Sequence, residues 1–130
     1  LLSKEQKLNC KISDEIENGE IAPYSVYKNR GLKIFFDTGF RWINDISFIE
    51  FKENTKLFSS STISFKKEDN NINFKMTEFF TEEKKSKNIE YEISYDIIKG
   101  LIIYRKNYFD FDGNIFFSTT VKGICKKISY

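Results

Sequence analysis

The sequence predicts an all-β domain of about eight antiparallel strands, arranged as a meander that forms a closed or nearly closed barrel. Two observations favour this fold: apolar residues recur at every second position, and short polar turns separate the alternating segments. A two-sheet β-sandwich is the alternative. At 130 residues the chain has the size of one domain, so we treat 1–130 as a single unit with tails at 1–6 and 126–130.

The strand over residues 88–97 has the strictest alternation. Its apolar positions, from Ile89 to Ile97, alternate with Asn, Glu, Ser and Asp. Side chains of a strand point to opposite faces in turn, so this pattern predicts one buried and one solvated face. The inward row is Ile89, Tyr91, Ile93, Tyr95 and Ile97.

Two hairpins follow this strand. Residues 98–100 and the pair Asp112-Gly113 predict tight turns, because Gly tolerates the positive φ that such turns need. A strand over 101–108 lies between them, and a long strand begins at Ile115. Its expected inward row is Ile115, Phe117, Thr119, Val121, Gly123 and Cys125.

The N-terminal two thirds of the chain show the same period less regularly. Strands are expected at 8–13, 32–36 and 47–52, with a hairpin over 61–79 whose turn is Glu68-Asp69-Asn70-Asn71. Residues 14–31 are the least regular, and we expect a loop there with one short strand at 24–27. A helical turn is possible within 77–87.

The two cysteines lie near opposite ends of the chain, on the expected inward faces of the first and last strands. A meander that closes into a barrel makes these strands neighbours, so Cys10 and Cys125 are expected to form a disulfide that staples the seam. Two unpaired buried thiols are the alternative. A disulfide implies an oxidising compartment: secreted, periplasmic or surface-exposed.

The residues that most enzymes use are missing or scattered. The chain has no His, which removes the commonest general base and most zinc sites, and its six Gly form no phosphate loop. The run Asp110-Phe111-Asp112-Gly113-Asn114 is similar to the start of a calcium loop, but it lacks the closing Glu, so a plain hairpin turn is expected. We therefore expect no enzyme activity, no cofactor and no metal.

Aromatic residues make up 17% of the chain, with 14 Phe and 7 Tyr, and some must face outward. Phe79-Phe80 and Phe116-Phe117 are adjacent pairs, so one member of each is expected on the outer face; Ile102 is a further outward candidate. The expected partner-binding residues are Phe35, Trp42, Phe80 and Phe116.

These expectations favour a non-catalytic, exported β-domain that binds a protein partner or forms a homo-oligomer through its outer aromatic surface. A small barrel that carries an apolar ligand is the alternative, and a carboxylate-based hydrolase is third. The net charge of +2 argues against nucleic acid, and no apolar stretch is long enough for a membrane span. The expected inward residues are mostly large, which favours a filled barrel over a carrier.

Overall fold

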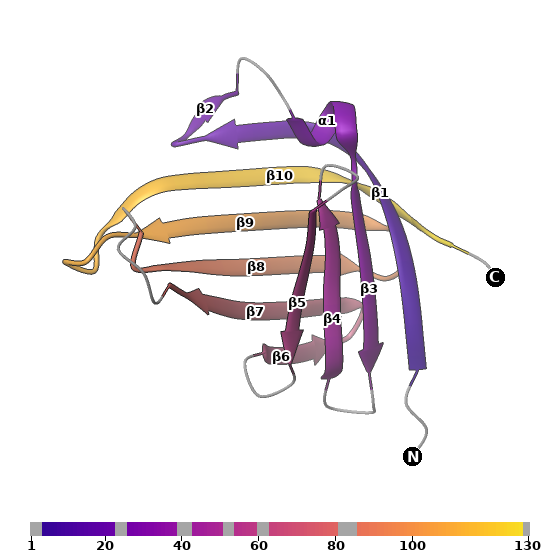
Figure 1. Ribbon diagram of the computed structural model, residues 1–130. Coiled ribbons are helices and arrows are strands. Elements are labelled where there is room, and N and C mark those ends of the chain that lie inside the picture. Colours follow the sequence, from indigo (N-terminus) through magenta and orange to yellow (C-terminus); the bar gives the residue numbers. More distant parts are fainter. Residues whose placement is uncertain are drawn as a thin grey trace.

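The computed structural model describes residues 4–22, 26–38, 43–50, 54–59, 63–80 and 86–128. Within these ranges it contains ten strands and one short helix (Figure 1). The elements are β1 (Lys4–Glu17), β2 (Glu20–Ile21), α1 (Val26–Arg30), β3 (Leu32–Thr38), β4 (Ile43–Glu50), β5 (Asn54–Ser59), β6 (Ile63–Glu68), β7 (Asn71–Phe79), β8 (Asn88–Asp96), β9 (Leu101–Phe109) and β10 (Ile115–Lys127).

All strand pairs are antiparallel, and nine strands follow one path: β5-β4-β3-β1-β10-β9-β8-β7-β6. The tenth, β2, pairs with the end of β1. The sheet curls into a nearly closed barrel, so the predicted all-β antiparallel barrel is confirmed, with about ten strands in place of eight.

Strand β1 joins two parts of the sheet that run in different directions (Figure 1). Its first part, residues 4–10, pairs with β3, and residues 8–17 pair with β10. We call β3, β4 and β5 the short arm and β10 to β6 the long arm. In the described pairing, Leu8, Asn9 and Cys10 are the three β1 residues that pair with both arms.

The open seam of the barrel lies between β5 and β6, the two ends of the strand path. The sequence placed the seam between the first and last strands, which was wrong. Those strands are neighbours as expected, but they are continuously paired from Leu8 to Glu17, with one register shift. The disulfide therefore joins two strands inside the sheet, and the unpaired edges are β5 and β6.

Large side chains from both arms meet in the interior. The predicted inward row of β8 is confirmed: Ile89, Tyr91, Ile93 and Tyr95 are buried, and Ile97 packs partly buried against the same core. Rings from facing strands touch, as in Phe36 with Phe74, whose centroids are 5.2 Å apart. Each such buried side chain contributes about 2 kcal/mol through loss of apolar contact with water.

Two bulges change which residues face inward. In β10 the register shifts between Ile115 and Phe117, which leaves Phe116 as an extra residue and turns Ile115 outward. The predicted inward position of Ile115 is therefore wrong, and the predicted outward position of Ile102 is also wrong, because Ile102 is buried. In β1 Ser13 is the extra residue, and the shift turns Glu15 inward.

The region 14–31 is more regular than expected. The turn Asn18-Gly19, with φ of 50° and 85°, connects β1 to β2. The prediction of a short strand at 24–27 is wrong, because Val26 and Tyr27 belong to the helix α1. Residues 77–79, where a helical turn was possible, belong to β7. Among the described residues, no helix has the length and apolar character needed to cross a bilayer.

The end strands are also longer than expected. Lys4 to Gln6 pair with β3 although residues 1–6 were expected to form a tail, and β10 continues to Lys127. The extension of β10 adds backbone pairs to Leu8 and Asn9, two of the residues that pair with both arms, and the extension of β1 lengthens its pairing with β3.

Gly123 allows β1 and β10 to approach at the β1 bulge. A Cβ atom there would clash with the carbonyl oxygen of Lys11 and would lie 3.0 Å from the Cα of Ile12. Both are backbone atoms of β1, so a side chain at this position forces the two strands apart.

We predict that Gly123→Ala lowers the free energy of unfolding by about 2 kcal/mol or more, because the added methyl overpacks a paired backbone. Urea denaturation followed by circular dichroism measures this change. The control is Lys122→Ala, at the neighbouring exposed position, which should cost less than about 0.5 kcal/mol. Equal stabilities of the two variants would show that the close approach at Gly123 is unimportant.

Candidate functional site

A cluster of polar side chains is buried inside the barrel. Glu50 of β4 has only 2% of its surface exposed, and its carboxylate accepts a hydrogen bond from the Tyr27 hydroxyl. The Lys106 ammonium lies 3.2 Å from the same carboxylate, and the Tyr104 hydroxyl lies 3.4 Å from its second oxygen. We call Tyr27, Glu50, Tyr104 and Lys106 the polar cluster.

The alternation of the strands places these groups. Glu50 continues the inward row of β4 after Ile46 and Phe48, which are both buried. Tyr104 and Lys106 continue the inward row of β9, two residues apart. A strand thus brings a charged side chain into the interior by the same geometry that buries its apolar neighbours.

The helix α1 supplies Tyr27. It ends at Arg30 and is followed by Gly31, whose φ is +80° and whose N–H donates to the Tyr27 carbonyl over 2.7 Å. The Tyr27 N–H in turn donates to Oε1 of Glu15 over 3.2 Å, and Glu15 is buried because of the β1 bulge. The bulge and the helix therefore fix Tyr27 between two carboxylates.

The Lys106 ammonium also faces two rings. It lies 5.2 Å from the ring centroid of Tyr27 and 5.9 Å from that of Tyr104, and these two rings meet edge to face. Cation–π attraction and the ion pair with Glu50 compensate for removing the ammonium from water. This arrangement holds a positive and a negative charge in an apolar barrel with hydrogen-bonding partners for each.

Burial changes the acidity of the tyrosines. Loss of water is the largest cause that raises the pKa of Tyr27, Tyr91 and Tyr104, and the nearby carboxylate of Glu50 raises each further. For Tyr91 the hydrogen bond that its hydroxyl donates to Glu78 over 2.8 Å adds to the shift. All three hydroxyls therefore stay protonated in the folded protein well above pH 10.

Cys10 and Cys125 come together as the sequence predicted. They are directly paired residues of β1 and β10, and their Sγ atoms lie 2.02 Å apart, at disulfide distance. Cys10 also pairs with Leu32 of β3, so the cystine lies at the corner where the two arms meet.

Of the four aromatic residues expected to bind a partner, the structure describes three, and these three do not form one surface. Phe35 is half-buried on the outer face of β3, with the Lys7 ammonium 5.8 Å from its ring. Phe80 packs against the core, and its neighbour Phe79 is the outward member of the pair. Phe116 is exposed on β10, and Trp42 lies outside the described residues.

A different apolar surface lies at the end of the barrel where β7 and β9 end and β8 and β10 begin. Phe79 is opposite Asn88, Asn88 is opposite Phe109, and Phe109 is opposite Ile115, so these residues form one outward row across four strands. The exposed apolar residues there are Phe79, Phe111, Ile115 and Phe116, at 71%, 62%, 52% and 44% exposure, and we call them the hairpin patch.

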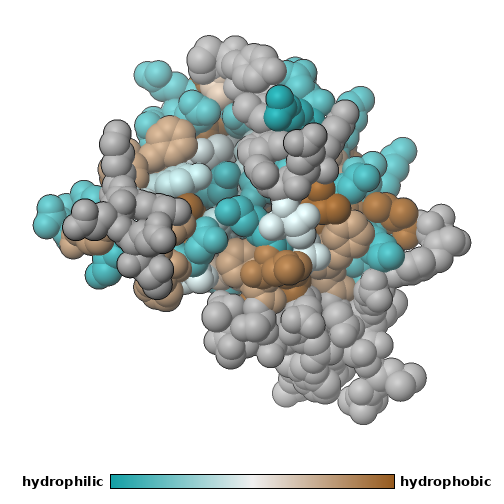
Figure 2. All heavy atoms as spheres, in the orientation of Figure 1, coloured by the Kyte–Doolittle hydropathy of each residue, from teal (hydrophilic) through white to brown (hydrophobic). Residues whose placement is uncertain are grey.

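The middle of the same outer sheet face is polar. Glu92 pairs with Lys75 over 3.5 Å and with Arg105 over 2.9 Å, and Asn73 donates to Ser94. Figure 2 shows the face that is turned to the viewer in Figure 1, where apolar residues form separate groups among hydrophilic ones. The described outer face of the long arm therefore offers local apolar contacts at its end and a polar middle.

The run 110–114 forms a hairpin turn, as expected. Asp110 Oδ1 accepts hydrogen bonds from the N–H groups of Asp112 and Asn114, and Gly113 has a φ of 84°. Across the described residues, no group of three or more His, Cys, Asp or Glu is placed to hold a metal ion.

Sequence reasoning missed the polar cluster. Glu50 shares one face of its strand with Phe48, and Ile49 lies on the other face. The alternation in the sequence did not decide which of these two faces is buried. The continuation of the Ile102 and Tyr104 row to Lys106 would have been a usable signal, but Ile102 was assigned to the outer face. Tyr27 carried no signal, because α1 was expected to be a strand.

We predict strong coupling between Glu50 and Lys106 in a double-mutant cycle. Lys106→Met alone leaves a buried carboxylate without its cation and should cost about 3–5 kcal/mol, whereas the double variant with Glu50→Leu removes both charges and should cost far less than the sum of the single changes. Denaturation of the four proteins gives the coupling energy.

The matched control is the exposed pair Lys66 and Glu68, which lie 2.8 Å apart and are changed to Met and Leu in the same way. Its coupling should stay below about 1 kcal/mol, because solvent screens exposed ion pairs. Similar coupling energies for the two pairs would contradict the buried state of the Glu50–Lys106 pair.

We also predict that stability falls as pH rises above about 10, the pKa of an unperturbed tyrosine. Below that pH the hydroxyls of Tyr27, Tyr91 and Tyr104 are protonated in both states; above it the unfolded chain loses these protons and the folded protein keeps them. Each such tyrosine then removes up to about 1.4 kcal/mol of stability per pH unit.

Absorbance at 295 nm and circular dichroism, recorded together during an alkaline titration, test this prediction. Part of the tyrosinate signal should appear only as the fold is lost. Ionisation of every tyrosine near pH 10 with an unchanged fold would show that the three hydroxyls are accessible to water.

Comparison with known proteins adds no assignment: no family model matches the chain, and neither the curated proteins nor the solved structures gave a significant match.

Proposed function

We propose that this protein is a non-catalytic β-barrel module that acts through protein contacts, chiefly with a second copy of itself. The observation that carries the proposal is the hairpin patch, whose four apolar side chains come from β7, the 110–114 turn and β10 and are 44–71% exposed. Clustered exposed apolar residues are typical of interaction sites.

The chemistry of the hairpin patch favours a second copy as the partner. An apolar surface is complementary to an identical apolar surface, because neither copy has to supply an opposite charge, and a two-fold axis lets the same residues face each other. The unpaired edges of β5 and β6 offer a second route to association, since free strand edges pair readily with other chains.

The disulfide supports the proposal of an extracytoplasmic location. Cystines persist in oxidising compartments, and this one closes a loop of 115 residues. We accordingly propose that the module works outside the cytoplasm, on a cell surface, in a periplasm or as a secreted protein.

A carrier of an apolar ligand is the second candidate, and the polar cluster is the observation in its favour. Ligand-binding barrels combine apolar walls with a few polar groups that orient the guest, and Lys106 could pair with the acid group of such a ligand in place of Glu50. Against it, the described interior is occupied by large side chains in contact, such as Phe58 and Tyr91 at 5.3 Å.

A carboxylate-based hydrolase has less support. Glu15 and Glu50 are both buried, and both already accept hydrogen bonds from Tyr27. A paired-carboxylate site needs acids that reach a substrate and an attacking water.

We predict that the disulfide-bonded protein forms a dimer or larger assembly as its concentration rises, and that Phe79→Ser/Ile115→Ser reduces it to a monomer. Sedimentation equilibrium measures the mass of each. Ile98→Ser is the control, because Ile98 in the turn between β8 and β9 is 73% exposed but lies outside the hairpin patch and away from the edges of β5 and β6, and its variant should associate like the original protein.

A strictly monomeric protein at all concentrations would overturn the proposal. Native mass spectrometry of the same samples tests the carrier: a lipid-sized mass that remains bound, and that is lost in Lys106→Met, would place the carrier first.

A further inference from the structure

We propose that the outer surface beside the disulfide binds a sulfated glycan chain, a site independent of the hairpin patch. Two adjoining grooves, of about 590 and 410 Å³, lie where α1 meets β1, β3 and β10. They share Asn9, Arg30 and Gly31 in their walls and are therefore adjacent, and we call the two together the basic groove.

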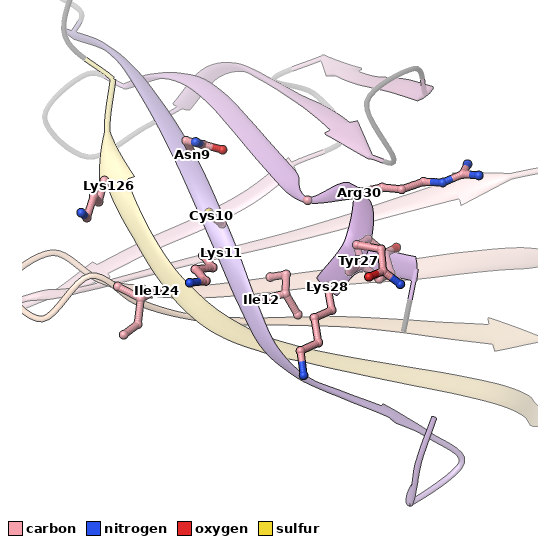
Figure 3. A pocket seen from close by; sticks show the side chains of 11 residues that line it. Asn9, Cys10, Lys11, Ile12, Tyr27, Lys28, Arg30, Ile124 and Lys126 are labelled. Atoms are coloured by element: carbon pink, nitrogen blue, oxygen red, sulfur yellow. The ribbon is translucent and has the colours of Figure 1, made fainter. Parts of the chain in front are cut away.

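The basic groove is lined by five cationic side chains and no acidic one among the residues that the structure describes. The larger part is lined by Lys11 of β1, Lys126 of β10 and Lys28 and Arg30 of α1. In Figure 3 the Arg30 side chain extends away from Lys11 and Lys126. Lys33 of β3 lines the smaller part. This concentration is unusual in a chain whose 21 basic and 19 acidic residues nearly balance.

The strand register fixes the spacing of the cations. Lys33 is opposite Asn9, and Asn9 is opposite Lys126, so the two lysines flank Asn9 on the outer face about 10 Å apart, two interstrand distances. Lys11 follows two residues along β1, about 7 Å from Asn9. An extended polyanion can therefore contact several of these charges at once.

Internal ion pairing does not account for four of these five cations. Lys11, Arg30, Lys33 and Lys126 are all exposed, and none forms an ion pair with a described residue, in contrast to Lys75 and Arg105 on the long arm. Cations in the last turn of α1 favour the helix dipole, which explains Lys28 and Arg30, but not the three lysines on strands.

The residues of the basic groove that carry no charge indicate which class of polyanion it binds. Tyr27 and Ile12 in the wall are buried, so no described aromatic ring is exposed there to stack a nucleic-acid base, and the exposed apolar contribution is mainly Ile124 at 53%. A bound peptide would need pockets for its side chains. A sulfated saccharide needs only cations and hydrogen-bonding groups, which the lysines, Arg30 and Asn9 supply.

Fluorescence anisotropy with a labelled, heparin-derived hexasaccharide tests the proposal on the disulfide-bonded protein. We expect binding at about 0.15 M NaCl that weakens steeply with added salt, because the contacts are between exposed charges. The triple variant Lys11→Gln/Lys33→Gln/Lys126→Gln should bind at least about tenfold more weakly, a change that corresponds to about 1.4 kcal/mol.

The control triple variant is Lys66→Gln/Lys67→Gln/Lys87→Gln. It removes the same number of positive charges from exposed positions on or beside β6 and β8, outside the basic groove, and should stay within about twofold of the original affinity. All six residues are exposed, so both variants should fold, which circular dichroism checks. The desulfated hexasaccharide should not bind.

Three outcomes would overturn the proposal. The first is no binding by the original protein at low or physiological salt, and the second is an equal loss in the two triple variants, which would indicate net charge alone. The third is tighter binding of a poly-glutamate peptide of matched charge, which would assign the basic groove to an acidic protein segment.

Discussion

The fold depends on the corner of β1, where three residues, Leu8 to Cys10, pair with both arms of the sheet. The cystine to Cys125 lies at this corner and joins residues 115 positions apart. On the chain-entropy model such a crosslink contributes about 4–5 kcal/mol, comparable with the whole stability of many domains. The corner thus holds together two arms whose other ends, β5 and β6, are not hydrogen-bonded to each other.

The same corner organises the interior. The bulge at Ser13 lets β1 turn and reverses its inward face, so that Glu15 points into the barrel and receives the N–H of Tyr27. Tyr27 then connects to Glu50, and Glu50 to Lys106 on the long arm. A polar link between the arms therefore accompanies the covalent one, and it sits among aromatic rings that fill the described barrel.

Local periodicity was sufficient to predict the strands of the long arm and the turn at 110–114, because each depends on alternation or on turn residues close in sequence. The pairing of the two cysteines, 115 residues apart, was predictable because closure of an antiparallel meander makes its first and last strands neighbours. Periodicity gave a wrong prediction where a bulge adds one residue to a strand, because the extra residue changes which face the neighbouring side chains point to. The bulge at Phe116 turned Ile115 outward, and the one at Ser13 buried Glu15, and neither bulge has a sequence signal. The polar cluster could not be predicted, because Glu50 and Lys106 are 56 residues apart and meet only when the arms close.

Amide hydrogen exchange followed by NMR tests the central claim, that the corner of β1 is the continuous part of the barrel and the β5–β6 boundary is its open seam. The account predicts the slowest exchange in β1 and β10 around Cys10 and Cys125, where exchange requires global unfolding, and fast exchange of the β5 and β6 amides that point toward the seam. Amides of β5 and β6 that are all as protected as those of β10 would contradict it, because the barrel would then be sealed at this boundary.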